Sequence, residues 1–110
     1  MNDLAIARRV QLEAALPGIV ERLVAIGAKK VILFGSLVTG RVAATSDIDL
    51  IVVLDRPGRF ADRLGAVYDA MESPVAVDAL VYTTAELDEL AQSRTFVRQA
   101  VREGRVLHAS

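Results

Sequence analysis

The chain has 110 residues, of which 53% are hydrophobic and 25% are charged, and its formal net charge is −1. This composition predicts one compact domain over residues 1–110 and excludes a disordered chain, and the near-neutral charge gives no electrostatic case for nucleic acid as a partner. There is no cysteine, no signal-peptide pattern and no apolar run near the roughly 20 residues of a membrane span, so we expect a cytoplasmic protein without membrane contact.

The first predicted element is a helix over Leu4–Ile26. Its apolar residues recur at intervals of mostly three or four, which is the helical period. They are Ile6, Val10, Leu16, Val20, Leu23 and Val24. Pro17 cannot donate the backbone hydrogen bond that a helix interior needs, so we expect a break or a kink before Pro17 and a second helix that ends at Gly27.

The next apolar run, Val31–Phe34, is short and contains β-branched residues, which is typical of a strand buried on both faces. Gly35-Ser36 follows at once. A turn after a strand can present free N–H groups to an anion such as phosphate, and a glycine there lets the backbone approach a ligand closely. We therefore expect Gly35 to accept no side chain larger than a methyl group.

A second strand is predicted over Asp47–Leu54, and it opens with two aspartates. Successive side chains in a strand point to opposite faces, so Asp47 and Asp49 are expected to project from the same side. Two carboxylates about 4 Å apart repel each other by about 4 kcal/mol at an effective dielectric constant near 20. The pair therefore needs solvent, protonation or a bridging cation, and Mg²⁺ is the natural bridge because it takes carboxylate oxygens as ligands.

After a turn at residues 55–58, the pattern predicts a helix over Arg59–Met71 and a third strand over Pro74–Tyr82. Asp78 is the single charge in the middle of that strand. A buried aspartate without a partner is costly, and this cost favours a functional role for Asp78.

Thr83 and Glu86 have the spacing of a capping box, so they mark the start of a helix that we expect to continue to Val101. The residues from Val106 onward are expected to form a short strand or a tail, with His108 in solvent. Leftover apolar side chains on the first and last helices are candidates for a docking surface, or they simply complete the core. They include Leu4, Leu12 and Phe96.

Two motifs and their spacing resemble a known family. Gly35-Ser36 is followed, after ten residues, by Asp47-Ile48-Asp49, and each motif is attached to an apolar strand. This arrangement resembles the signature of the DNA polymerase β-like nucleotidyltransferase superfamily and, within it, the minimal nucleotidyltransferases, which the late segment Arg102–Leu107 also resembles. The resemblance implies an α/β (α+β) nucleotidyltransferase fold, with helices packed on a small mixed sheet and the carboxylates at one rim.

The resemblance also implies roles for individual residues. Asp47, Asp49 and Asp78 would be the catalytic residues and the ligands of two Mg²⁺ ions. Gly35 and Ser36 would bind the β- and γ-phosphates of ATP. Each position also has a plain structural interpretation, in which Asp47 caps a strand, Asp49 is an edge-strand charge and Ser36 caps a helix.

One departure from the resembling branch concerns a basic residue. Members of the branch often carry it just before the glycine that ends the helix after Gly-Ser, where this chain has Thr39, with Arg41 just after Gly40. The sequence leaves open which basic residue reaches the triphosphate.

The implied function is metal-dependent transfer of AMP from ATP to a hydroxyl group on a partner protein. Small members of the resembling branch are antitoxins that adenylylate HEPN-domain toxins, so a HEPN-domain toxin is the expected partner. The alternative is a non-catalytic binding module that neutralises its partner by contact. The acceptor residue, the base preference and the oligomeric state stay open at this stage.

Overall fold

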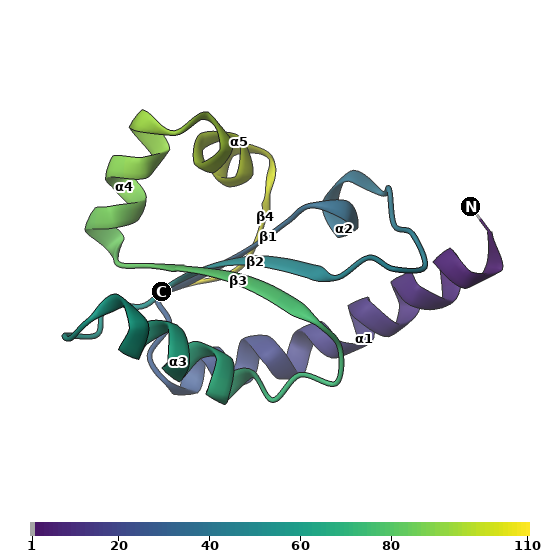
Figure 1. Cartoon of the computed structure of the whole chain (residues 1–110), viewed down its shortest axis with the longest axis horizontal. Helices are drawn as coiled ribbons and strands as arrows, with labels where there is room; N and C mark the ends of the chain where they lie inside the picture. Colours follow the sequence, from purple (N-terminus) through teal and green to yellow (C-terminus); the bar gives the residue numbers. More distant parts are fainter. Residues whose placement is uncertain (1) are drawn as a thin grey trace.

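The computed structural model describes residues 2–110, which form helices around a four-stranded sheet (Figure 1). The strand order is β3-β2-β1-β4; β2 and β3 are parallel, and the other neighbours are antiparallel. The predicted mixed α/β fold is therefore confirmed. The elements are α1 (Asp3–Ala25), β1 (Lys30–Phe34), α2 (Ser36–Thr39), β2 (Ile48–Val53), α3 (Phe60–Met71), β3 (Val77–Tyr82), α4 (Thr84–Ser93), α5 (Thr95–Glu103) and β4 (Arg105–Ala109).

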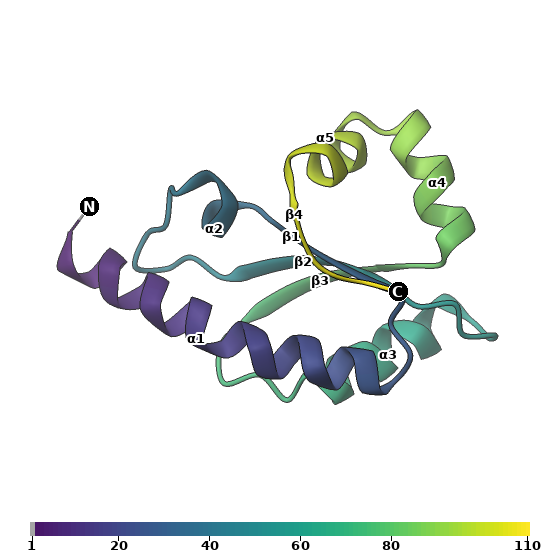
Figure 2. The ribbon, with the colours of Figure 1, turned by 180° about the vertical axis from the view of Figure 1, so that it is seen from behind.

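Helices cover both faces of the sheet. Figures 1 and 2 show, from opposite sides, α1 and α3 on one face and α4 and α5 on the other. The alternation of side chains along β2 explains this arrangement: Ile48, Leu50 and Val52 pack toward α1 and α3, whereas Ile51 and Val53 pack toward α4 and α5. Because both faces are covered, the central strand is apolar along most of its length.

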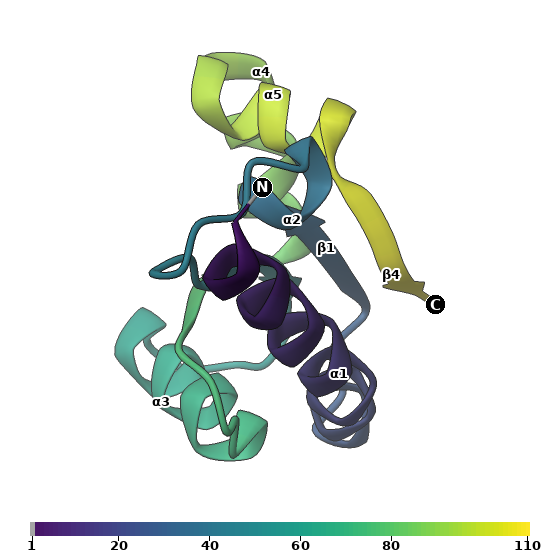
Figure 3. The same ribbon diagram turned by 90° about the vertical axis from the view of Figure 1, so that its right-hand side faces the viewer.

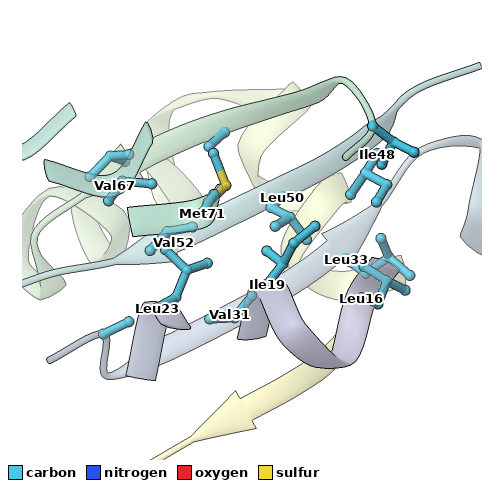
Figure 4. Close-up of a cluster of buried hydrophobic side chains, with 14 of the residues drawn as sticks. Leu16, Ile19, Leu23, Val31, Leu33, Ile48, Leu50, Val52, Val67 and Met71 are labelled. Atoms are coloured by element: carbon cyan, nitrogen blue, oxygen red, sulfur yellow. The ribbon is translucent and has the colours of Figure 1, made fainter. Parts of the chain in front are cut away.

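The larger core lies between α1, α3 and the sheet (Figure 4). Leu12, Ile19 and Leu23 of α1 are completely buried, as is Val67 of α3. Burying one such aliphatic side chain contributes about 1.5–3 kcal/mol, so these contacts hold α1 against the sheet along most of its length. No helix within residues 2–110 is both long and apolar enough to cross a bilayer.

The predicted break before Pro17 is wrong, because α1 runs through Pro17 as one helix. The missing N–H of Pro17 costs one hydrogen bond to the carbonyl of Glu13, and both residues are exposed, so water can reach that carbonyl. Leu16 and Ile19, on either side of Pro17, are buried in the same core, and their packing offsets the cost. Gly27 follows the helix with a left-handed backbone (φ 99°), which confirms its predicted role at the helix end.

The start of α4 is held by two carboxylates. The capping box is confirmed: the N–H of Glu86 donates to Thr83 Oγ1 at 3.2 Å, and the N–H of Thr83 donates to Glu86 Oε1 at 2.8 Å. Asp55, after β2, accepts hydrogen bonds from the N–H (2.7 Å) and the hydroxyl (2.6 Å) of Thr84. It also pairs with Lys29 at 3.1 Å. Together these contacts satisfy N–H groups that a helix start leaves unpaired.

The single helix predicted from Thr83 to Val101 is wrong, because α4 and α5 are separate helices. Arg94, between them, has an extended backbone (φ −120°, ψ 116°). Arg98 of α5 donates from its guanidinium to the carbonyls of Ala91 (3.1 Å) and Gln92 (2.7 Å), which satisfies acceptors at the end of α4. The break lets α5 turn and pack its own apolar face against the sheet.

The two edge strands agree with expectation in part: the short strand expected at Val106 and Leu107 is confirmed, because both residues lie in β4. His108 is not in a solvated tail, because it lies in β4, opposite Val31 of β1, and is half-buried. The third strand begins at Val77 and not at Pro74. The side chain of Ser73 binds both the N–H (3.1 Å) and the carbonyl (2.6 Å) two residues further on, so this segment forms a turn instead of extending the strand.

Candidate active site

Strand register places three site residues in one row at one end of the sheet. Phe34 of β1 is paired with Asp49 of β2, and Asp49 is paired with Asp78 of β3. Directly opposed residues project from the same face, and neighbouring strands are about 4.8 Å apart. The structure therefore brings Asp49 and Asp78 together on the face that carries α4 and α5.

Asp49 is the central carboxylate of this group. Burial raises its pKa above the ordinary value, and the negative charges of Asp78 and Asp47 raise the pKa further. The ionised form of Asp49 is therefore unfavourable unless a positive charge lies nearby. Carboxylate oxygens in this arrangement are the kind of ligand that a hard divalent cation prefers.

Asp47 lies close to Asp49 but not in the predicted strand. β2 begins at Ile48, so Asp47 belongs to the loop before it. The guanidinium of Arg8, on α1, pairs with Asp47 Oδ1 at 3.3 Å and donates from Nε to the carbonyl of Ser46 at 2.7 Å. A cation of the chain itself therefore holds Asp47 in place.

Arg8 is the site residue that the sequence interpretation missed. A weak signal exists: Arg8 lies three residues after Ala5 and four before Leu12, and both of these are buried. At that spacing Arg8 is on the stripe of α1 that faces the sheet. A charged residue on an apolar stripe needs a partner, and here the partner is Asp47.

Carboxylates are suitable ligands for a divalent cation, but Asp47, Asp49 and Asp78 do not converge on one point. Within residues 2–110, no group of three His, Cys, Asp or Glu side chains lies close enough together to hold a metal ion. Asp49 and Asp78 are neighbours, whereas Asp47 is engaged by Arg8. In this arrangement the charge of Asp47 is therefore balanced by Arg8 and not by a cation shared with Asp49 and Asp78.

The Gly-Ser motif lies directly against Asp49. Gly35 has φ 79° and ψ −149°, a conformation that side chains strongly disfavour, and a Cβ built on Gly35 would run into the carboxylate of Asp49. A methyl group at Gly35 would therefore strain the backbone and displace the carboxylate of Asp49, and a larger side chain would do so more severely. Ser36 is the first residue of α2 and not its N-cap, which is Gly35. A capping role therefore does not account for Ser36.

Comparison with known proteins identifies a family and a solved structure to which this chain is similar. The sequence model of the nucleotidyltransferase domain family matches residues 15–108, which include both motifs and Asp78. The crystal structure of a putative nucleotidyltransferase from Sulfolobus solfataricus is similar, with a TM-score of 0.64 and 26% sequence identity, over 81% of this chain and 82% of that chain. No curated protein matches the chain.

Proposed function

Because the chain belongs to the nucleotidyltransferase domain family, we propose that it transfers a nucleoside monophosphate, AMP from ATP, to a hydroxyl group on a partner protein. The observation that carries this proposal is the contact between the two motifs. Gly35 lies against the carboxylate of Asp49, and Asp49 is paired in register with Asp78. A triphosphate held at Gly35 would therefore lie beside the carboxylates.

The proposed binding roles follow from this geometry. Gly35 and Ser36 would bind the β- and γ-phosphates, because the backbone at Gly35 carries no side chain that could keep an anion away. Asp47, Asp49 and Asp78 would hold two Mg²⁺ ions. The chemistry that such ions supply is neutralisation of charge on the triphosphate and on the attacking and leaving oxygens.

The reaction forms a bond between the acceptor oxygen and the α-phosphorus of ATP and breaks the bond from that phosphorus to pyrophosphate, which leaves. The residues of this chain position the reactants, and positioning alone can supply much of the rate. The burial expected for Asp78 is wrong: Asp78 is exposed, because it lies on β3, an edge strand of the sheet. The side of Asp78 is therefore the open side, from which we propose that the acceptor hydroxyl enters.

An exposed apolar surface suggests where the partner protein docks. Leu4 and Val10, near the start of α1, are 71% and 63% exposed. Figure 1 shows that this part of α1, beside the label N, reaches past the end of the sheet. Leu12, which the sequence also offered as a docking residue, is completely buried and belongs to the core. Arg8 is on the same part of α1, so a partner docked there would lie beside Asp47.

By resemblance to antitoxins, we propose that the partner is a HEPN-domain toxin. A specific observation supports the second candidate function, a module that neutralises its partner by contact alone. Asp47 is paired with Arg8, and within the described residues the three carboxylates do not converge. Under this alternative the carboxylates would be idle.

One experiment separates the two functions. The purified protein is incubated with Mg²⁺, ATP labelled at the α-phosphate, and the product of the neighbouring gene, next to an Asp49→Asn variant. Labelled partner protein with the wild type, and none with the variant, supports the enzyme. Partner neutralisation by both proteins without any label supports the binding module and contradicts the transferase.

A further inference from the structure

A cavity of about 190 Å³ lies between α2 and α5, above the end of β1. Figure 3 shows α2 below α5, and residues of both helices line the cavity. The rings of Phe34 and Phe96 meet edge to face, with centroids 5.7 Å apart and planes at 82°. The lining includes Phe34, Gly35, Phe96, Gln99 and Glu103.

The size and the walls of this cavity suit one flat ring system. Sites for whole drug-sized ligands have volumes of about 300–1,000 Å³, so this cavity is too small for a complete nucleotide but large enough for part of one. Phe96 is 58% exposed, and its ring is therefore available to a ligand. Aromatic side chains at such positions stack readily on nucleobases, because every base has a π-face.

The cavity is continuous with the proposed phosphate site. Gly35 lines the cavity and also contacts the carboxylate of Asp49. Across the sheet the order is Asp78, Asp49, Phe34, so the cavity lies on the β1 side and the open acceptor side lies at β3. A nucleoside triphosphate with its phosphates at Gly35 can thus extend its base into the cavity without blocking the acceptor.

The polar rim of the cavity favours a base with an exocyclic amino group. Gln99 donates from Nε2 to Glu103 Oε2 at 3.4 Å, and both side chains come from α5. This hydrogen bond leaves the carbonyl oxygen of Gln99 and the second carboxylate oxygen of Glu103 as acceptors. Adenine offers an amino donor at position 6, and guanine and cytosine also carry amino donors, so this rim suits a base with an amino group without choosing among the three.

We propose that the cavity between α2 and α5 binds the base of the nucleoside triphosphate. Phe34 and Phe96 contact the ring, and Gln99 and Glu103 accept hydrogen bonds from its amino group. The inference rests on the proposed function in one respect, because it places the triphosphate at Gly35.

The test measures binding of ATP, GTP and inorganic tripolyphosphate, with Mg²⁺, to the wild type and to Phe96→Ala. We expect Phe96→Ala to weaken the binding of both ATP and GTP by about tenfold, the order of loss that removal of a base–aromatic stack produces. Tripolyphosphate binding should not change. Val106→Ala is the matched control, because Val106 is 51% exposed on β4 and does not line the cavity.

Each other outcome overturns the inference in a distinct way. Unchanged ATP binding in Phe96→Ala, with tripolyphosphate still bound, removes the base site and leaves the proposed function intact. If Phe96→Ala weakens ATP and tripolyphosphate binding equally, Phe96 affects binding of the phosphates and not of the base. If the wild type binds neither ligand, the proposed function fails together with the base site.

Photolabelling with 8-azido-ATP provides a second readout that depends on no variant. The label should fall on peptides from residues 34–39 or 95–104, which line the cavity. A label confined to α1 or α3, on the opposite face of the sheet, would place the base elsewhere and overturn the inference.

Discussion

At the scale of single residues, Asp49 carries an electrostatic cost that is built into the site. Its pKa is raised by burial first and by Asp78 and Asp47 next. When folding raises the pKa of a carboxyl group, the group costs no stability at pH values below its pKa in the unfolded chain. The free energy of unfolding is then reduced as the pH rises through the pKa of the folded protein. At neutral pH the ionised Asp49 therefore destabilises the metal-free protein.

This cost predicts the behaviour of Asp49→Asn. In EDTA at pH 7 the variant should melt higher than the wild type by roughly a few degrees, and the difference should vanish near pH 3. Transferase activity should be lost. Asp88→Asn, an exposed change on α4, is the control and should alter neither property. A variant that melts lower at pH 7, or that still transfers nucleotide, would contradict the placement of Asp49.

Gly35 permits a sharper structural test. In Gly35→Ala the new methyl group meets the carboxylate of Asp49 and the backbone is strained at φ 79°, so we expect a loss of about 1–3 kcal/mol of unfolding free energy. ATP binding should fall as well. Gly65→Ala is the matched control, since no atom lies within 4 Å of its Cβ position in α3, and it should stabilise by up to about 1 kcal/mol. Denaturant unfolding and calorimetric ATP titration measure both effects, and a Gly35→Ala protein as stable as the wild type would refute the close contact.

Arg8 competes with metal for Asp47. In Arg8→Gln the carboxylate of Asp47 loses its 3.3 Å ion pair, so we expect Mg²⁺ to bind severalfold more tightly without nucleotide. Arg9→Gln is the control, because Arg9 pairs with Glu13 on the surface of the same helix. Weaker Mg²⁺ binding in Arg8→Gln would instead mean that Arg8 positions Asp47 for the metal.

At the scale of elements, the contacts of Asp55 at the start of α4 make the free energy of unfolding depend on pH in the acid range. Hydrogen bonds from Thr84 and the contact with Lys29 lower the pKa of Asp55 to about 2. Because this pKa is depressed, the stabilising contribution is present above the unfolded pKa near 4 and is lost as the pH falls toward 2.

We therefore expect Asp55→Asn to destabilise the protein at pH 7 by about 0.5–2 kcal/mol, the range for loss of a hydrogen bond that caps a helix. The difference from the wild type should shrink as the pH falls from 4 to 2. Urea unfolding across this range measures it. A difference that stays constant with pH would show that the charge of Asp55 does not contribute.

At the scale of the whole molecule, the exposed end of α1 is the proposed docking surface. The double variant Leu4→Ser, Val10→Ser should weaken partner binding by about tenfold or more, because both positions lose apolar area that the partner would bury. Stability and ATP binding should be retained, since both side chains are largely exposed. Phe60→Ser on α3 is the control, with Phe60 51% exposed. Equal partner binding by all three proteins would place the interface elsewhere.

The sequence by itself determined the features that depend on neighbouring residues. The apolar runs of β1 and β2, the capping box at Thr83 and the glycine after Phe34 all follow from local spacing and backbone preference, and the structure places each where the pattern predicts it. The motif spacing also identified the family, which the match over residues 15–108 shows.

Only the tertiary structure decided the features that join distant segments. The parallel register of Asp49 with Asp78, the pairing of Arg8 with Asp47 and the strand that includes His108 each depend on packing between elements far apart in the chain. Packing also overrode local preference where α1 continues through Pro17, because buried side chains on both sides of Pro17 offset one lost hydrogen bond. Local patterns report which face of an element is apolar, whereas register and side-chain pairing are set by the partner against which that face packs.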